Sequence, residues 1–596
     1  MLRELYDYAL RENLILPAGY VKKPVRAYIS LSRGGKYVGI ISTSSEKVPC
    51  PDIGSLANSG DKCNVLAEKR SILFPSDEKQ REKYAAKAAY FRETMADAAR
   101  MEPRLKFCLD ALCNEEVAAS VSGELDRLKL DDAKVLSFMV DGVSILEYPA
   151  VRSWWEQFRQ QFRPSGSRAP CLIPGKLTIP TATVPPISGL SVVGGHARGD
   201  ALICFDKDAF CSYGLKQGAN APVSEDAFAG VKAALDELLK NAPVLSGMKF
   251  VHWYDKPVEA ECDCIDSIIC SAFNDEDDED AGLRQEPDVD PKPARDQANE
   301  HIASVKTGTP VHDLPNLYYI LLLSGVGGRV MVRSYEVGNY GQLTENLRKW
   351  ESDLSLINSS GTAAIKPAKL SARLIRLMAK QSSDKNVFDR MSKELAGLTP
   401  AIISAIVNGT QLPNATAVRA LSYIRSQMLS STAENQVRKT PDPWACQWLK
   451  VWLCRKERQK YQKEELAMEY NEKHPDPAYH CGALVAVYGE IQRLAMGDVN
   501  ASLIDRYYAS AIQTPALVLG QLSKLSNYHI GKLSNWQKRD YAELRDQVAC
   551  AIGDNAPTVL SPELQSYFAL GYYQMCAKIA KDRRIRAAAA AEKKAD

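Results

Sequence analysis

The pattern of hydrophobic and polar positions along the chain changes at about residue 366. Before this point, alternating segments at 25–32 and 37–42 predict two strands joined as a hairpin. Two largely apolar runs at 317–323 and 329–335, separated by a glycine-rich turn, predict a second hairpin. Beyond residue 366 the strand pattern disappears and a helical period dominates. The pattern predicts an α+β N-terminal region followed by an all-α C-terminal helical bundle.

This change, together with the charge pattern, predicts five segments. The first is an α+β domain, and the second is an acidic, mobile insertion because it contains six consecutive acids. The third adds a β-hairpin and a helix that complete the N-terminal region. The fourth is a helical connector and the fifth is the C-terminal helical bundle. In chain order the segments are 1–270, 271–300, 301–365, 366–467 and 468–596.

The C-terminal bundle has the clearest helical signal. Leu484, Val487, Tyr488 and Ile491 share one face of a predicted helix. Asp476 or Pro477 is a suitable start for this helix, and Gly497 is a suitable end. We therefore expect an antiparallel bundle with a core of its own.

The composition is that of an ordinary globular protein. The 596 residues include 75 Lys and Arg against 73 Asp and Glu, so the chain as a whole is not a polycation. The sequence contains no apolar run long enough to span a membrane, and its acid-bearing N-terminus does not resemble a signal peptide. The 15 cysteines are mostly isolated, which favours reduced thiols. We therefore expect a cytoplasmic protein without a membrane partner.

The residues that could carry chemistry do not form a recognisable catalytic set. The glycine-rich run 324–329 lacks the spacing and the Lys-Ser/Thr ending of a phosphate-binding loop. Cys262, Cys264 and Cys270 have no second cysteine pair or nearby histidine to complete four metal ligands. His480 fits a hydrogen-bonded core residue better than a catalyst. We therefore expect no metal, no cofactor and no enzymatic activity.

Local positive charge near the N-terminus points to nucleic acid. Between residues 20 and 74, nine Lys and Arg stand against four Asp and Glu. Within and just after the long loop 49–64, polar and basic residues could contact bases and phosphates. A helix cap at the asparagine with solvated basic residues is an equally open alternative. The candidate DNA-binding residues are Asn58, Lys62, Asn64, Lys69 and Arg70.

Two further loops add candidates for DNA binding. The glycine-rich loop 188–199 allows close backbone approach and carries Arg198. A short strand is expected at 201–205, and the loop after it offers the amides of Gln217 and Asn220, which could read or wedge a base pair. Each amide alone is more often a turn residue. Ser224 is expected to cap the helix that follows.

Several blocks of the chain resemble the large subunit of type I-C CRISPR Cascade, and they occur in the family's order. The plainest is 199–224, in which Ala209-Phe210, Ser212-Tyr213-Gly214, Gln217 and Asn220–Ser224 match the family pattern. The other blocks are Pro17–Tyr20, Val48–Leu66, Leu321–Arg333 with the helix that carries Trp350 and Asp353, Pro477–Gly482, Asn500, Asp505–Tyr507, Thr514–Pro515 and Phe568–Gln574.

The resemblance implies a subunit of an RNA-guided surveillance complex. Such a subunit recognises the protospacer-adjacent motif in double-stranded DNA, starts strand separation for R-loop formation and recruits a separate helicase–nuclease. The implied partners are the guide RNA (crRNA), target DNA, and the backbone and guide-end-capping subunits of Cascade. A metal-dependent nuclease of a defence system and a purely structural helical scaffold are the alternative readings.

The resemblance also implies a small subunit made from within the same gene. Met468 stands just before the Pro477–Gly482 block and is a suitable internal start. The product would resemble the small subunit and would hold the displaced DNA strand through basic residues. The candidate contacts with that strand are Arg506, Lys524 and Lys532.

Overall fold

The computed structural model shows two compact units. The first unit contains Met1–Ser191, Gly195–Lys240 and Gly325–Val330, and the second contains the rest of the chain. The predicted insertion 271–300, including its acidic run, lies outside the described residues. The structure describes residues 1–17, 19–44, 47–162, 167–259, 263–265, 316–358, 361, 397–429, 439–461, 466–497, 499, 501–554 and 556–595.

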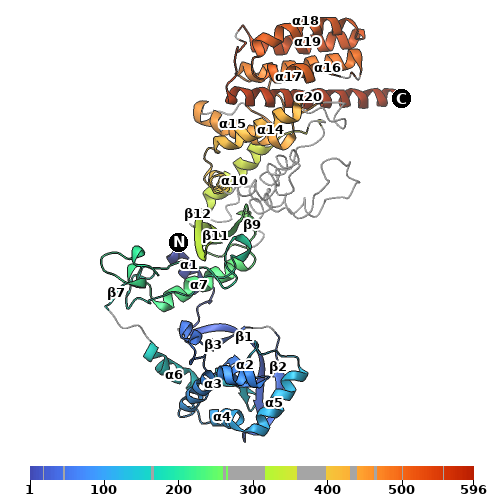
Figure 1. The fold of residues 1–596 in the computed structure, drawn as a ribbon. Helices are drawn as coiled ribbons and strands as arrows, with labels where there is room; N and C mark the ends of the chain where they lie inside the picture. Colours follow the sequence, from blue (N-terminus) through green and yellow to red (C-terminus); the bar gives the residue numbers. More distant parts are fainter. Residues whose placement is uncertain are drawn as a thin grey trace. The chain divides into compact units, whose positions relative to one another are not determined.

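A twisted sheet of mixed direction lies in residues 20–144 of the first unit (Figure 1). Its main strands run in the order β2-β1-β5-β4, with β3 paired to β1 and β6 paired to β5. The antiparallel pairing of β1 with β2 confirms the hairpin predicted at 25–32 and 37–42. The strands are β1 (Tyr20–Leu31), β2 (Tyr37–Ser42), β3 (Lys47–Pro51), β4 (Glu68–Lys69), β5 (Val135–Val140) and β6 (Val143–Ser144).

Helices cover this sheet and bury a core with it. Phe91 and Met95 of α3 and Trp155 of α6 pack in one cluster with Phe138 of β5. Asp77 caps α3 by accepting a hydrogen bond from the Gln80 amide at 2.7 Å, which explains why that helix begins there. The helices of this region are α2 (Arg70–Leu73), α3 (Glu78–Ala98), α4 (Leu105–Cys113), α5 (Glu115–Arg127) and α6 (Pro149–Phe158).

The remainder of the first unit consists mostly of loops beside two packed helices, α1 (Leu2–Arg11) and α7 (Glu225–Lys240). The Ser224 hydroxyl accepts a hydrogen bond from the Ala227 amide at 3.2 Å, which confirms the predicted cap. The prediction of a strand at 201–205 is wrong. Only Ala201 bridges to a neighbour, Arg329, and a strand needs a partner along its length.

A second sheet, in the order β12-β11-β10-β9, opens the second unit. The strands β11 and β12 confirm the second predicted hairpin, and their turn uses positive φ angles at Gly327 (57°) and Gly328 (81°). β10 pairs antiparallel with β11, as in Val251 opposite Leu321. The strands are β9 (Val244–Leu245), β10 (Met248–Tyr254), β11 (Leu317–Val326) and β12 (Arg329–Asn339).

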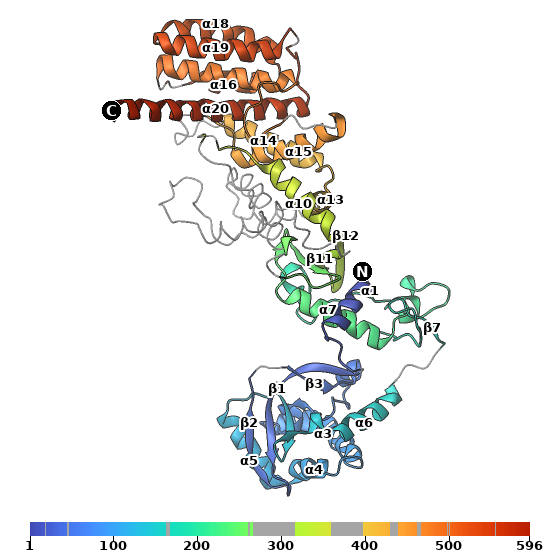
Figure 2. The ribbon, with the colours of Figure 1, turned by 180° about the vertical axis from the view of Figure 1, so that it is seen from behind.

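In the residues that the structure describes, the rest of the second unit is mainly helical, as the sequence predicts. Figures 1 and 2 show α16 between the α18–α19 pair and α20, while α14 and α15 lie against the other side of α20. None of the helices in the described ranges has the length and apolar character that crossing a membrane requires. The described helices of the second unit are α10 (Tyr340–Leu354), α13 (Thr399–Asn408), α14 (Asn414–Leu429), α15 (Pro443–Tyr461), α16 (Pro477–Met496), α17 (Leu503–Ala511), α18 (Pro515–Gly531), α19 (Asn535–Ile552) and α20 (Pro562–Ala595).

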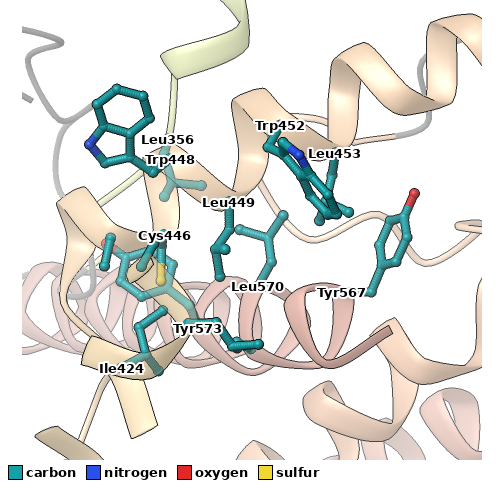
Figure 3. Close-up of a cluster of buried hydrophobic side chains, with 14 of the residues drawn as sticks. Leu356, Ile424, Cys446, Trp448, Leu449, Trp452, Leu453, Tyr567, Leu570 and Tyr573 are labelled. Atoms are coloured by element: carbon teal, nitrogen blue, oxygen red, sulfur yellow. The ribbon is translucent and has the colours of Figure 1, made fainter. Parts of the chain in front are cut away.

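The C-terminal helices share their core with the helices before them. One cluster of buried side chains runs from Leu245 to Ile579 without a break at the predicted boundary near residue 468. Figure 3 shows Cys446 and Leu449 of α15 directed toward α20, which contributes Leu570. The bundle therefore does not have the separate core that we expected from the sequence, because α20 is covered on two sides.

The helix α16 is the central element of this core. The Asp476 side chain accepts a hydrogen bond from the Ala478 amide at 2.8 Å, Pro477 occupies the first turn and Gly497 follows the last turn, which confirms the predicted ends. Every residue from Ala478 to Tyr488 is buried. A helix that is buried all round must lie inside the fold rather than on its surface.

A pair of glycines allows α16 and α20 to cross closely. A Cβ atom added at Gly482 would overlap the carbonyl oxygen of Phe568, and one added at Gly571 would overlap that of Tyr479. The Tyr479 hydroxyl also donates to Gln574 Oε1 at 2.6 Å. The family-like blocks 477–482 and 568–574 therefore meet each other in the core, where they pack two helices together.

Candidate nucleic-acid interface

The predicted basic loop of the first unit begins after a short 3₁₀ helix at Gly54–Asn58. The Asn58 side chain lies outside the described part of the structure. Lys62 is half-buried, and its Nζ lies 5.8 Å from the centre of the Phe162 ring. Lys69 is exposed on β4. The two lysines are therefore the basic side chains of this loop that are available to a phosphate.

Asn64 is held by a neighbouring carboxylate. Glu68 Oε2 accepts hydrogen bonds from the Asn64 backbone amide at 2.9 Å and from Asn64 Nδ2 at 3.2 Å. Asn64 Oδ1 is buried and has no hydrogen-bond partner. A buried amide oxygen without a partner is costly, by about 1–3 kcal/mol. The Asn64 amide can read a base edge only after it leaves Glu68.

Arg70 has a structural role that the sequence did not reveal. Its side chain is 3% exposed, and its guanidinium donates to Asp126 Oδ1 at 2.6 Å, to the Leu130 carbonyl at 2.6 Å and to the Phe74 carbonyl at 3.3 Å. These partners use the donors that would hold a phosphate. The placement argues against Arg70 as a DNA contact, although its neighbour Lys69 points to solvent.

The second candidate loop presents Arg198 to solvent. Asp200, two residues further along the chain, is fully buried and accepts hydrogen bonds from the His196 backbone amide at 3.1 and 3.2 Å. A Cβ atom at Gly195 would overlap the Asp200 carboxylate, which explains the glycine there. The hydrogen bonds of the buried Asp200 carboxylate thus hold the loop in place, and Arg198 is the exposed basic residue of this loop.

The third candidate loop, 212–220, is held together by Asn220. Its Oδ1 accepts from the Ser212 amide at 2.8 Å, and its Nδ2 donates to the Leu215 and Gln217 carbonyls at 3.2 and 3.0 Å. These bonds occupy the amide of Asn220, so it shapes the loop rather than reading a base. Gln217 is exposed and has a positive φ of 43°.

The same loop presents Tyr213, which belongs to the family-like block 199–224 and was not among the site residues predicted from the sequence. The side chain is 100% exposed and its φ is +53°. A left-handed conformation costs a non-glycine residue about 1–2 kcal/mol. The Arg329 guanidinium lies 4.9 Å from the ring centre of nearby Phe210. A strained, fully exposed aromatic side chain on a braced loop is typical of a binding surface. The position of Tyr213 before Gly214 in a family-like block was the signal available in the sequence.

One comparison with known proteins identifies the family. The model of the family described as CRISPR-associated protein (Cas_Csd1) matches residues 2–579. The chain belongs to this family. Csd1 proteins are the large subunit of type I-C Cascade. Among curated proteins, none matches the chain.

Within this Csd1 chain, the candidate DNA-binding residues of the first unit come from loops that no direct bond between these residues links. No hydrogen bond or ion pair between described residues joins Lys62, Asn64 or Lys69 to Arg198 or Gln217. The predicted displaced-strand residues belong to the second unit, where all three are exposed. They are Arg506 on α17, Lys524 on α18 and Lys532 just after α18.

His480 of the Csd1 chain is held by hydrogen bonds inside the fold. Tyr470 donates its hydroxyl to His480 Nδ1 at 2.6 Å, and His480 Nε2 donates to the His474 carbonyl at 2.7 Å. Burial lowers the pKa of His480, which favours its neutral form. This confirms His480 as a hydrogen-bonded core residue. In the described ranges, no group of three or more His, Cys, Asp or Glu could hold a metal ion.

Proposed function

We propose that this subunit recognises the protospacer-adjacent motif in double-stranded DNA and starts strand separation for R-loop formation. The observation that supports the proposal most is membership of the Csd1 family over residues 2–579. Sequence reading beyond the motif is then delegated to the guide RNA, as in another type of RNA-guided effector. The motif is read by the first unit, through Lys62, Asn64 and Lys69.

The loops of the first unit supply the contacts for this role. Lys69 and Arg198, which are exposed, and Lys62, which is half-buried, neutralise phosphates. Asn64 turns from Glu68 to a base edge when DNA binds, and this movement satisfies its buried oxygen. Tyr213 acts as a wedge at an unstacked base step, a use of apolar side chains known from other DNA-bending proteins.

The complex supplies the remaining partners. The guide RNA, the backbone subunits and the guide-end-capping subunit hold the large subunit in Cascade, and a helicase–nuclease is recruited after the R-loop forms. The subunit itself is not an enzyme in this proposal. Purified chain with Mg²⁺ should leave single- and double-stranded DNA intact, and cleavage that tracks the chain through purification would favour the metal-dependent nuclease instead.

A binding assay with matched duplexes tests motif recognition. Cascade assembled with the parent chain should prefer a motif-bearing duplex over a motif-free one. Asn64→Ala should weaken binding only to the motif-bearing duplex, by about 5- to 150-fold, because a specific base contact is worth about 1–3 kcal/mol. Lys62→Ala and Lys69→Ala should weaken binding to both duplexes and reduce the salt slope by about 1 each.

Lys106→Ala is the matched control, since Lys106 is exposed on α4 of the same unit and away from the loop. It should leave both affinities unchanged. Parental binding by a Lys62→Ala/Asn64→Ala/Lys69→Ala variant across salt concentrations would show that another surface reads the DNA.

We also propose that a second product begins at Met468. This residue precedes α16, so the product contains α16 to α20 complete. It lacks α15, and the face of α20 that includes Leu570 must then find another partner. Mass spectrometry of a complex expressed from the native gene tests this. If only the full-length chain is detected, although the internal start and its ribosome-binding sequence are intact, the proposal is refuted.

A further inference from the structure

The first unit consists of two parts between which the chain passes twice. Residues 20–162 contain the sheet, its helices and a core of their own, whereas α1, α7 and the loops of 167–240 form the other part. The chain passes from one part to the other at Pro17–Tyr20 and again after Phe162. The family-like block Pro17–Tyr20 therefore lies at a connection between the two parts, and motif recognition as proposed above does not use it.

The Arg159 guanidinium lies against Gly19 at this connection. A Cβ atom added at Gly19 would lie 2.6 Å from Arg159 Nε, and the φ angle of Gly19 is +76°. Glycine thus suits both the left-handed backbone and the space that the guanidinium fills. The Gly19 carbonyl accepts a hydrogen bond from the Asp52 amide at 2.9 Å, which ties the connection to the sheet.

Arg159 also bonds to the other part of the unit. Its Nη2 donates a hydrogen bond to Glu225 Oε2 at 2.6 Å, in the first turn of α7. The Arg159 side chain is 9% exposed and that of Glu225 is 50% exposed. Hydrogen bonds between charged groups are about twice as strong as those between neutral groups. Arg159 therefore fastens the start of α7 to the part that contains the sheet.

On the sheet side, Arg159 leads directly to the predicted basic loop. Arg159 and Phe162 belong to one short 3₁₀ helix, Arg159–Phe162. Lys62 Nζ lies 5.8 Å from the centre of the Phe162 ring, and this ring meets that of Phe158 edge-on at 5.6 Å between centres. A single helical turn thus connects Arg159 to Lys62.

On the other side, the start of α7 is fixed to the loop that presents Tyr213. The Val223 carbonyl accepts a hydrogen bond from the Thr181 amide at 3.0 Å, and the Gly218 amide donates to the Ala182 carbonyl at 3.0 Å. The neighbouring residues Thr181 and Ala182 therefore hold both the approach to α7 and the loop 212–220. A movement of α7 against the sheet would carry this loop with it.

We propose that Arg159 is a positioning residue for DNA binding by the first unit. Through Glu225 it holds the loops of Lys62 and Tyr213 in one fixed arrangement, so that both reach the same duplex. Groups that are already arranged before binding lose less conformational entropy when they bind, which raises the affinity. The proposal rests on the proposed function, because it takes the DNA contacts of Lys62 and Tyr213 from there.

Charge reversal at the half-exposed end of the pair tests the proposal. Cascade assembled with Asp226→Arg is the matched control, since Asp226 is exposed at the next position of α7 and the charge changes equally. Glu225→Arg should bind the motif-bearing duplex about 5- to 150-fold more weakly than this control, the size of coupling that is typical between two sites. Glu225→Gln, a milder change, should act in the same direction.

Two further measurements separate positioning from folding. The double variant Arg159→Glu/Glu225→Arg reverses both charges and should recover most of the affinity that Glu225→Arg loses. Tyr213→Gly should weaken binding in the parent but not in Glu225→Arg, because the ring is then no longer held where it reaches the duplex, so the two losses are not additive. Urea denaturation of every variant shows which affinity losses occur at parental stability.

Three results would overturn the proposal, and they differ in what they leave standing. Equal affinities of Glu225→Arg and Asp226→Arg would remove Arg159 as a positioning residue and leave motif recognition untouched. Additive losses for Glu225→Arg and Tyr213→Gly would show that the pair acts on folding and not on the placement of the loops. Parental binding by both Lys62→Ala and Tyr213→Gly would show that another surface binds the duplex, and the positioning role would fail with the proposed function.

Discussion

Two regions that both contain family-like blocks contribute to the protein in opposite ways. In the second unit, blocks 477–482 and 568–574 face each other at the crossing of α16 and α20, and both glycines are there because no Cβ atom fits. In the first unit, block 199–224 forms a braced loop whose tip, Tyr213, touches nothing. A recognisable block therefore reflects close packing in one region and a presented side chain in the other.

The difference follows from what each region can bury. α16 is buried along most of its length, so its side chains are fixed by their neighbours. Residues 212–220 bury little and depend on the three hydrogen bonds of Asn220 for their shape. Substitutions should therefore affect folding in the first region and binding in the second.

The largest expected effect on folding is at the helix crossing. Gly482→Ala should destabilise the second unit by about 3 kcal/mol, because the new methyl group meets the backbone of α20, which cannot move aside cheaply. Gly520→Ala, in α18 with open space around it, should stabilise by about 0.5–1 kcal/mol. Urea denaturation of both variants measures the difference, and equal midpoints would contradict the close crossing.

Adjacent residues of the first unit give the next largest effect. Arg70→Ala should cost about 1–3 kcal/mol, because it leaves the Leu130 and Phe74 carbonyls without their donor. Lys69→Ala should change stability by less than about 0.5 kcal/mol, since its side chain is exposed. If denaturation shows that Lys69→Ala lowers the stability more than Arg70→Ala does, Arg70 does not have this structural role.

Removing the brace of the exposed loop should have a smaller, local effect. Asn220→Ala should weaken the loop by about 1 kcal/mol, because it loses hydrogen bonds in a partly solvated setting. The Ser212 amide, which donates to Asn220, should exchange its hydrogen faster. Gln217→Ala is the matched control at a neighbouring exposed side-chain amide. If the Ser212 amide exchanges its hydrogen at a similar rate in both variants, Asn220 does not hold the loop together.

The smallest effect on folding is expected at Tyr213. Tyr213→Gly should keep the stability within about 0.5 kcal/mol of the parent, because the ring packs on nothing and glycine accepts a positive φ. Binding of the motif-bearing duplex to assembled Cascade should fall, whereas Tyr213→Phe should preserve it. If Tyr213→Gly lowers the stability but leaves DNA binding normal, Tyr213 contributes to folding rather than to binding, contrary to the contrast drawn between the two regions.

Both hairpins, the ends of α16 and the cap at Ser224 could be predicted, because each depends on a few neighbouring residues. The strand at 201–205 could not, since a local pattern does not reveal whether a partner strand is adjacent. Among the site residues, the basic character of the loop near Lys62 is visible in the sequence. The burial of Arg70 is not, because Asp126 and Leu130 lie far along the chain.

The sequence by itself determined the order of the regions, the hairpins, the helix ends and the family, since all of these depend on local residue patterns. Only the tertiary structure decided which polar side chains are available. It placed Arg70 and Asn64 against partners, left Tyr213 in solvent and joined the C-terminal helices to α15 in one core. The physical reason is that burial and hydrogen bonding depend on neighbours in space, and for Arg70 these neighbours, Asp126 and Leu130, are distant in the chain.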